Sequence, residues 1–503
     1  MKPASSVFLP PIAFENGKGR PLYRQLHDWF QRAIASGQLR PGQRVPSTRA
    51  LAAELNISRI PVLNAYEQLH AEGYLETFVG AGTRVATSIP RDAIAASPAI
   101  GRPAPRKARR RISQDSLAAS PAAPQPWLHI SGAFRMHVPA LDQFPVDVWS
   151  RLVARNARKL AERMAYGDPM GYAPLREAIA EYLRVARAVR CGPSQVMIVA
   201  GSQQGLQLSA RVLLNPGDPV WIEEPGYPGA RQAFATARAR LIPVPVDKEG
   251  LNVAEGIRRC RNARAVYITP SHQYPLGATL SAARRVQLLD WASRSCAWII
   301  EDDYDCEFRH GNSPMASVQG LDPDARVVHV GTFSKALFPA IRLGHVVVPS
   351  DLVPAFARAR QAADIFPSTL YQAVLSDFIA EGHFARHARR MRMLYSNRCI
   401  ALVLAIRDQM DGMLDIIGAD AGMHLAGLLP RGMDDTTVAR KAAENGVAAM
   451  PLSTCCLKRP SRGGLVLGYG AADIPQIQAG VRRLKMILCG EMSRRKYRPA
   501  MST

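Results

Sequence analysis

Apolar residues near the start of the chain recur at steps of three and four, the spacing of one face of a helix. Leu22, Leu26 and Phe30 carry the first of these patterns. Two shorter patterns follow, and Ser47 and Ser58 stand where each would begin. Serine side chains commonly cap the N-termini of helices. The pattern therefore predicts three short helices within the first 73 residues.

Two short extended runs, residues 74–79 and 83–86, follow the third helix and flank Gly80-Ala81-Gly82. Glycine permits the backbone of a tight turn, so these runs predict a hairpin. Three helices and a hairpin form a winged helix-turn-helix, in which the start of the third helix meets base edges and phosphates of DNA. A three-helix adaptor without a DNA role is the alternative, and it leaves Arg59 unexplained.

The next segment is rich in Ala, Pro and Ser and has no apolar periodicity, which favours a disordered linker. Its basic cluster, residues 106–111, is either a solvated charge run or a contact to phosphates that would steepen salt dependence. We predict four segments: a DNA-binding domain 1–86, a linker 87–129, a large domain 130–490 and a basic tail 491–503.

Beyond residue 130, near-continuous apolar runs of strand length alternate with helical patterns. This alternation predicts an α/β domain whose mostly parallel sheet is covered on both faces, with a smaller C-terminal α+β part. Ligands of such sheets bind beyond the carboxyl ends of the strands. The runs are 196–200, 220–223, 265–269, 297–300, 326–330, 345–348 and 465–469.

Lys335 lies between two of these runs, in a segment of small and apolar residues. Burial disfavours a charged ammonium and lowers its pKa, and a partly neutral lysine can form a Schiff base with a carbonyl. Nearby Ser334 and Arg342 supply a hydroxyl and a cation suited to phosphate. The alternative is an ordinary surface lysine.

Polar residues follow other strands of the series. Gly201-Ser202-Gln203 opens a helix, where backbone N–H groups bind anions. Asp302 can pair with a protonated ring nitrogen, Tyr304 can bond a ring oxygen, and Tyr227 can stack on a flat ring. Each residue alone is more often structural, but together they indicate one site.

The excess of basic residues favours a polyanionic partner. The 503 residues carry 64 basic and 41 acidic side chains and a formal net charge of +23. The eight cysteines lack disulfide-framework or metal-ligand spacing, so we predict free thiols and no metal. No signal layout and no apolar run of about 20 residues is present, so we predict a cytoplasmic protein with no membrane partner.

The amino-acid sequence of residues 20–86 resembles that of the GntR-type winged helix, notably at residues 45–49, Ser58-Arg59 and 80–83. Ile60-Pro61 departs from the polar residues that are more usual there, so base reading can differ locally. The resemblance implies that DNA is contacted by Arg49, Ser58, Arg59, Gly82 and Thr83.

Residues 130–490 resemble fold-type I pyridoxal-phosphate aminotransferases, through the strand-end motifs above and the turn 269–277. The resemblance implies an internal aldimine on Lys335. A further ring-oxygen donor is Gln273 or His272. The other cofactor-binding residues that it implies are Asp302, Tyr304, Tyr227, Ser202, Gln203, Thr332, Ser334 and Arg342.

One departure concerns the arginine that usually holds a substrate α-carboxylate in these enzymes. Val466 aligns with it, and Arg462 precedes the strand. Arg231 is an alternative contact for an anionic ligand. Residues 166–172 match the segment that reaches the partner subunit, which implies a homodimer.

The whole chain outside the linker resembles the MocR/GabR family of transcription regulators. This resemblance implies a homodimer in which each DNA-binding domain packs onto the other subunit, and an operator in double-stranded DNA. A small amino compound, or pyridoxal phosphate, would be sensed through aldimine chemistry at Lys335, with little or no transaminase turnover. The alternatives are a working aminotransferase with an appended DNA-binding domain, and a DNA-binding module whose body is only a dimerisation scaffold.

Overall fold

The computed structural model describes residues 12, 14, 20–78, 82–87, 130–309, 316–410 and 412–496. The chain divides into two compact units, Met1–Arg111 and Ile112–Thr503, and each is described by itself. The expected turn residues Gly80 and Ala81, the linker with its basic cluster, and residues 497–503 lie outside the described residues.

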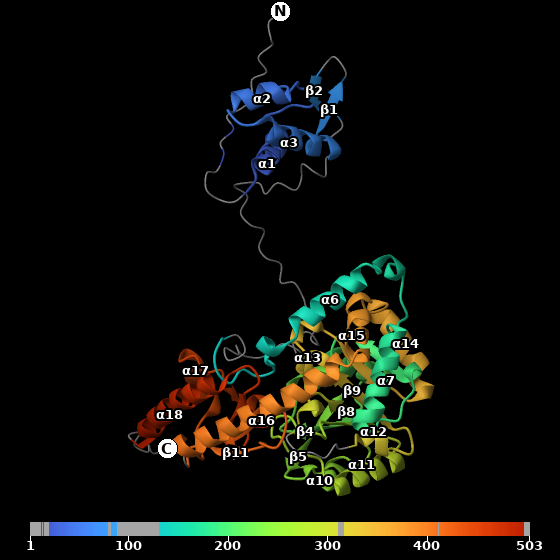
Figure 1. Ribbon diagram of the computed structural model, residues 1–503, viewed down its shortest axis with the longest axis vertical. Coiled ribbons are helices and arrows are strands. Elements are labelled where there is room, and N and C mark those ends of the chain that lie inside the picture. Colours follow the sequence, from blue (N-terminus) through green and yellow to red (C-terminus); the bar gives the residue numbers. More distant parts are fainter. Residues whose placement is uncertain are drawn as a thin grey trace, which may run out of the picture. The chain divides into compact units, whose positions relative to one another are not determined.

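The first unit is a winged helix-turn-helix, as the sequence predicts (Figure 1). Its hairpin is antiparallel, with Leu75 opposite Val85. Leu26, Phe30 and Leu69 are wholly buried and form its core. The elements are α1 (Leu22–Ala35), α2 (Thr48–Glu54), α3 (Arg59–Ala71), β1 (Leu75–Phe78) and β2 (Gly82–Val85).

The two serines predicted as caps behave differently. The Ser47 side chain accepts a hydrogen bond from the Ala50 N–H at 3.2 Å, which caps α2. Ser58 occupies the N-cap position of α3, but its side chain makes no capping hydrogen bond. The exposed Ser58 hydroxyl therefore remains available at the start of the recognition helix.

The second unit is built on an eight-stranded sheet in the order β3-β10-β9-β8-β7-β4-β5-β6. Strands β5, β4, β7, β8 and β9 run parallel to their neighbours in that series. The strands are β3 (Val196–Val199), β4 (Pro219–Glu224), β5 (Arg240–Asp247), β6 (Gly250–Leu251), β7 (Ala265–Ile268), β8 (Trp298–Asp303), β9 (Val327–Thr332) and β10 (Gly344–Val347).

Strand β10 differs from the parallel series that the sequence suggests, because it runs antiparallel to both β9 and β3. The connection from β9 to β10 spans only Phe333–Leu343. A parallel return needs a crossover of about a dozen residues or more, usually a helix that packs on the sheet. The segment containing Lys335 is therefore a turn between antiparallel strands.

Side chains alternate between the two faces of the large sheet. Val220 and Ile222 point to one face, and Trp221 points to the other. The first face is covered by α8 (Ser202–Leu213), α9 (Pro228–Thr236) and α14 (Val353–Asp364). The opposite face is covered by α7 (Ala173–Arg187), α15 (Leu370–Ala380), α10 (Val253–Arg259), α11 (Ala282–Arg294) and α12 (Val318–Leu321).

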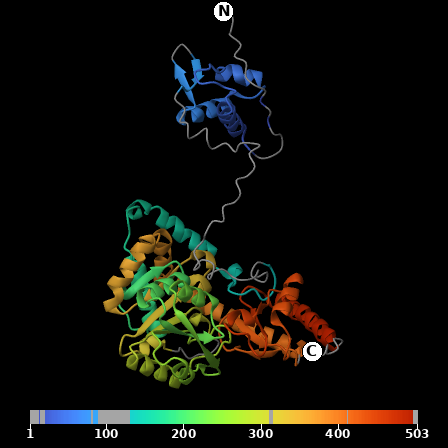
Figure 2. The ribbon, with the colours of Figure 1, turned by 180° about the vertical axis from the view of Figure 1, so that it is seen from behind.

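A smaller C-terminal part lies beside the large sheet, coloured orange to red (Figure 1, Figure 2). Its antiparallel sheet has the order β11-β12-β14-β13, and α18 extends into the segment predicted as a tail. No helix among the described residues is long and apolar enough to cross a membrane. The remaining elements are α6 (Val146–Ala157), α13 (Phe333–Ala336), α16 (His383–Met410), β11 (Asp415–Ile417), β12 (His424–Leu428), α17 (Asp435–Glu444), β13 (Met450–Pro451), β14 (Gly464–Gly468) and α18 (Ile474–Lys496).

Gly205 lets α8 lie close to the sheet. A Cβ there would stand 2.8 Å from a methyl of Val346 and 3.1 Å from one of Val330. We expect Gly205→Ala to lower the free energy of unfolding by about 1–3 kcal/mol through overpacking. The control Gly490→Ala, in open space on α18, should raise it by roughly 0.5–1 kcal/mol. Chemical denaturation measures both, and equal stability changes would contradict the close packing.

Candidate functional site

Thirteen residues enclose a cavity of about 200 Å³ at the carboxyl edge of the parallel strands. Side chains at or after the ends of β3, β4, β7, β8 and β9 contribute to it, as the rule for open α/β sheets predicts. The lining residues are His137, Ser202, Gln203, Tyr227, Tyr267, Thr269, Tyr274, Asp302, Tyr304, Thr332, Ser334, Lys335 and Arg342.

Nine of the ten residues predicted to bind a cofactor line this cavity, and Gln273 does not. The Gln273 amide donates to the carbonyls of Tyr274 at 2.7 Å and Pro225 at 2.9 Å, and to Glu223 at 3.2 Å. It holds the turn after β7 in place. The neighbouring Tyr274 enters the cavity instead, together with His137, Tyr267 and Thr269, which sequence reasoning missed.

Lys335 lies in the short helix α13, at the end of β9. Burial lowers the pKa of its amine to about 8, although the carboxylates of Asp305 and Asp302 oppose this shift. The Nζ atom donates a hydrogen bond to the His137 carbonyl at 3.4 Å. Roughly a tenth of the amine is therefore uncharged at pH 7, far more than for an ordinary lysine, and this neutral form can attack a carbonyl carbon.

Asp302 ends β8 and faces the same cavity. Its Oδ2 accepts a hydrogen bond from the Tyr267 hydroxyl at 2.9 Å, and its buried Oδ1 has no partner among the described residues. Burial raises the pKa of Asp302 to about 7, and the bond from Tyr267 works against that rise. The unpartnered Oδ1 can therefore accept a hydrogen bond from a donor such as a protonated ring nitrogen.

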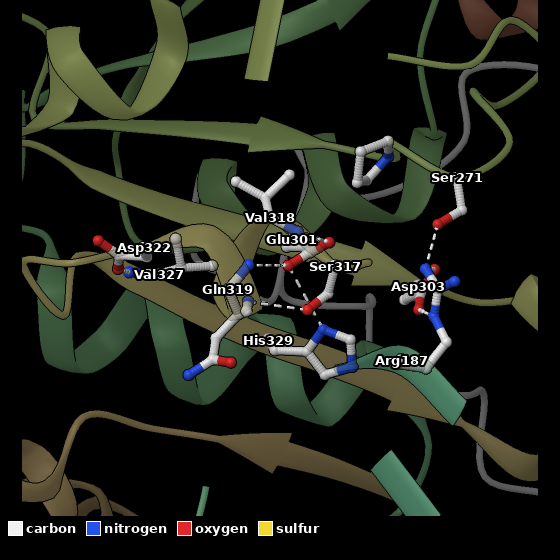
Figure 3. Close-up of polar contacts among 12 residues, drawn as sticks. Arg187, Ser271, Glu301, Asp303, Ser317, Val318, Gln319, Asp322, Val327 and His329 are labelled. Atoms are coloured by element: carbon white, nitrogen blue, oxygen red, sulfur yellow. Dashed lines mark hydrogen bonds and ion pairs between the residues drawn. The ribbon is translucent and has the colours of Figure 1, made fainter. Parts of the chain in front are cut away.

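A buried polar network supports the strand that carries Asp302 (Figure 3). Arg187 donates to Asp303 at 2.7 and 3.1 Å, and to the Ser271 hydroxyl at 2.6 Å. Burial alone would raise the pKa of Asp303, but the Arg187 guanidinium holds it well below its usual range. The Glu301 carboxylate accepts the N–H groups of Val318 and Gln319, which fixes β8 against α12.

The opposite end of the cavity suits a phosphate. Ser202 begins α8, whose N-terminal N–H groups and dipole favour an anion. The Arg342 guanidinium lies beside Gly201, where a Cβ would be only 3.2 Å from it, and Gly201 has a positive φ of 86°. The buried Ser334 hydroxyl has no hydrogen-bond partner among the described residues. These donors form an anion cradle.

The residues predicted to contact DNA lie on the first unit. Arg49 and Arg59 are exposed, and the Arg59 Nε donates to Thr48 at 3.2 Å. Gly82 and Thr83 begin the second strand of the wing, and the Arg44 guanidinium approaches Gly82. Ile60, beside Arg59, is also largely exposed, as expected for a helix start that faces a partner.

Two family models match the chain. Residues 22–85 match "Bacterial regulatory proteins, gntR family", and residues 138–468 match "Aminotransferase class I and II". The aminotransferase family depends on pyridoxal phosphate, and the unpartnered Asp302 Oδ1, the Ser334 hydroxyl and the anion cradle suit the ring nitrogen and phosphate of that cofactor.

Similar proteins include both regulators and enzymes. The probable rhizopine catabolism regulatory protein MocR of Rhizobium meliloti is 39% identical over 92% of this chain and 93% of its own length. The pyridoxine biosynthesis transcriptional regulator PdxR of Corynebacterium glutamicum is 30% identical over 92% and 95%. The structure of LysN, the α-aminoadipate aminotransferase of Thermus thermophilus, complexed with N-(5'-phosphopyridoxyl)-L-leucine, has a TM-score of 0.71 and 29% identity, covering 76% of this chain and 98% of that one.

The lowered pKa of Lys335 generates a prediction for cofactor loading. As pH rises through about 8, the amine loses its proton, so the rate of reaction with pyridoxal phosphate should rise and then level off. Absorbance of the protein-bound chromophore measures that rate from pH 6.5 to 9.5. The exposed-lysine control Lys248→Ala should behave as the parent protein does. A rate that is still climbing steeply above pH 9.5 would contradict a depressed pKa.

Proposed function

Because the chain belongs to the MocR-type family of transcription regulators, which join a GntR helix-turn-helix domain to an aminotransferase class I and II domain, we propose that it regulates transcription in response to an amine bound beside Lys335. The observation that carries the proposal is a cavity of about 200 Å³ that Lys335 lines, in a chain whose other unit presents the exposed Arg59 at the start of α3.

Pyridoxal phosphate supplies, when bound, an aldehyde that joins reversibly to amines and a ring that accepts negative charge. Lys335 presents the amine that holds it. Asp302 Oδ1 would keep a proton on the ring nitrogen, and Tyr227 would lie along the ring. Ser202, Ser334 and Arg342 would bind the phosphate, with Gln203 and Thr332 shaping the same end of the cavity.

The Tyr304 hydroxyl, expected to bond a ring oxygen of the cofactor, contacts His272 in this structure. It donates to the His272 carbonyl at 3.0 Å and lies 3.2 Å from His272 Nδ1. It still lines the cavity, so it can turn toward a ring oxygen. Tyr274, which follows β7, is another of the four tyrosines that line the cavity, and its hydroxyl lies 3.2 Å from His137 Nε2.

The DNA side of the function rests on the start of α3 and on the wing. Arg59 and the free Ser58 hydroxyl stand at the N-terminus of α3, where phosphates and base edges are reached in helix-turn-helix proteins. Arg49 on α2 and the Gly82–Thr83 wing would add backbone contacts. The partner is double-stranded DNA carrying an operator.

Regulation requires that the amine ligand favour one arrangement of the regulator over another. Couplings of this kind are commonly about 1–3 kcal/mol, which is a roughly 5- to 150-fold change in affinity. The charge of the Lys335 side chain beside Asp302 and Asp305 would differ according to whether its amine is free or holds the cofactor, and this difference would change the charge balance of the cavity. That change is the proposed signal.

The regulator acts as a homodimer in this proposal. Tyr166, in the segment 166–172 expected to reach a partner subunit, is 84% exposed, and Met164, just before that segment, is 77% exposed. Val146, at the start of α6, is 58% exposed as well. Large apolar side chains so exposed on one region are suited to burial against a second copy.

Steady transamination is the second candidate function, because the cofactor side of the site is complete. Keto-acid formation over many turnovers with a panel of amines distinguishes the two. Rapid steady-state turnover favours the enzyme, whereas a single turnover or none, with ligand-dependent DNA binding, favours the regulator.

Arg59 provides a test of the DNA interface. Arg59→Ala should weaken operator binding by about 1–3 kcal/mol, because it removes a charged contact at the recognition helix. The control Arg24→Ala, on α1, should bind within about twofold of the parent protein, since a single surface charge away from DNA contributes little. Gel-shift titrations on DNA upstream of the gene measure both, and equal losses would contradict the assignment of α3.

Lys335 provides a test of ligand sensing. Lys335→Ala removes the amine that holds the cofactor, so the effect of an amine ligand on DNA binding should disappear while DNA binding without ligand persists. Footprinting on the DNA upstream of its own and adjacent genes, with and without pyridoxal phosphate and candidate amines, measures this. The control is Lys248→Ala, and an unchanged ligand response in Lys335→Ala would contradict sensing at this residue.

A further inference from the structure

His137 and Tyr274 form one side of the cavity, near the Lys335 amine. The Tyr274 hydroxyl and His137 Nε2 are 3.2 Å apart, and the two rings stack at 5.5 Å with an angle of 20°. His137 has a positive φ of 65°, which non-glycine residues rarely adopt and which is often found at functional sites. The fold holds this imidazole in place against a backbone preference.

The same side of the cavity is uncharged. Burial, and then the Lys335 ammonium, keep the pKa of His137 well below its ordinary value. Burial, followed by the neighbouring His272 and His137, does the same for the pKa of His424. These imidazoles are therefore neutral, and each offers one donor and one acceptor nitrogen.

A second layer of polar groups lies behind Tyr274. His272 Nδ1 is 2.9 Å from Asp305 Oδ2, and the His272 and His424 rings are 4.8 Å apart. The buried Nε2 atoms of both histidines have no partner among the described residues. The possible ligand atoms of the three residues lie within 4.8 Å of one another, looser than the roughly 3.3 Å between ligands of tetrahedral zinc. Spare hydrogen-bonding capacity is the simpler description.

The position where aminotransferases carry their carboxylate-binding arginine is apolar in this chain. Val466 is wholly buried in β14 and pairs with Met450 of β13. The sulfur of Met450, the residue paired with Val466, lies 3.8 Å from the Tyr274 hydroxyl.

Two arginines remain to be considered near the cavity. Among the described residues, Arg342 supplies the one guanidinium that lines it, at the phosphate end. Arg231 donates to the Thr454 carbonyl at 2.5 Å and does not line the cavity. The Arg231 charge reaches Tyr274, but its guanidinium is held by the Thr454 carbonyl outside the cavity lining, so a ligand carboxylate beside Tyr274 would be buried without a direct cationic partner, which is costly.

We propose that the effector is a primary amine whose other polar groups are uncharged hydroxyls, and that His137 and Tyr274 select it by hydrogen bonding. A hydroxyl both donates and accepts, so it can satisfy a neutral imidazole and a phenol together. The inference rests on the proposed binding of an amine beside Lys335 and adds the chemical class of that amine.

Matched pairs of amino alcohols and amino acids test the proposal on the full-length protein loaded with pyridoxal phosphate. The pairs are 2-aminopropan-1-ol with alanine, and 4-aminobutan-1-ol with 4-aminobutanoate. Titration of the cofactor absorbance gives the affinity of each. We expect the amino alcohol of each pair to bind at least about 10-fold more tightly, because a buried carboxylate without a partner is penalised. Equal or tighter binding of the amino acids overturns the proposal.

Tyr274→Phe tests the selecting group, because it removes the hydroxyl and keeps the ring. It should reduce the preference for amino alcohols by roughly 3- to 10-fold, the loss of one hydrogen bond. Tyr371→Phe, a half-exposed tyrosine outside the cavity, is the control and should keep the full preference. A preference that is unchanged in Tyr274→Phe, with the chromophore intact, overturns the role of this residue.

Two further measurements distinguish a wrong effector class from a wrong proposed function. Arg231→Gln should leave the preference unchanged; tight amino-acid binding that is lost in this variant would show that Arg231 serves a carboxylate and would overturn the proposal. A protein that forms no Lys335-dependent chromophore would overturn the proposed function itself. A normal chromophore with a preference for amino acids overturns the effector class alone.

Discussion

Lys335 lies beside Asp302 and Asp305 in a partly open cavity, where burial and charge act on the pKa of its amine in opposite directions. Burial favours the neutral amine, and the two carboxylates favour the ammonium, which leaves the pKa at about 8. An amine so balanced is reactive and can be exchanged for another amine. The carboxyl edge of the parallel strands provides this position, since several strands deliver polar side chains to one place without interrupting the core.

Different residues around the cavity are suited to binding a cofactor and to selecting a ligand. Arg187 pairs with Asp303, and Glu301 binds backbone N–H groups of α12, so both carboxylates fix β8 while Asp302 keeps one oxygen free. The Arg342 end is cationic, and the His137 and Tyr274 side is neutral. A cofactor with a phosphate at one end and a reactive carbon at the other suits that asymmetry, and the neutral side leaves the choice of ligand to hydrogen bonds.

Strand-end motifs and helix periodicity were sufficient to predict the fold class and most of the cavity. Apolar runs mark the strands, Ser202 and Lys335 follow β3 and β9 closely, and Asp302 lies at the end of β8. Gln273 does not line the cavity because the chain turns between it and Tyr274, and sequence spacing does not show which of two neighbours points inward. His137 could not have been found, because it comes from a segment nearly 200 residues from Lys335 that only tertiary packing brings close. Strand β10 runs antiparallel to β9 because the connection between them, Phe333–Leu343, is too short for a helical crossover.

Reciprocal linkage is the most direct test of the claim that amine chemistry in one unit is coupled to DNA reading in the other. The affinity of an amine ligand, followed through the cofactor absorbance, is measured for the free protein and for the protein saturated with operator DNA. A ligand that alters DNA binding must have its own affinity altered by the same factor, so we expect a change of roughly 5- to 150-fold. Identical ligand affinities with and without operator DNA would contradict the coupling and leave two independent functions on one chain.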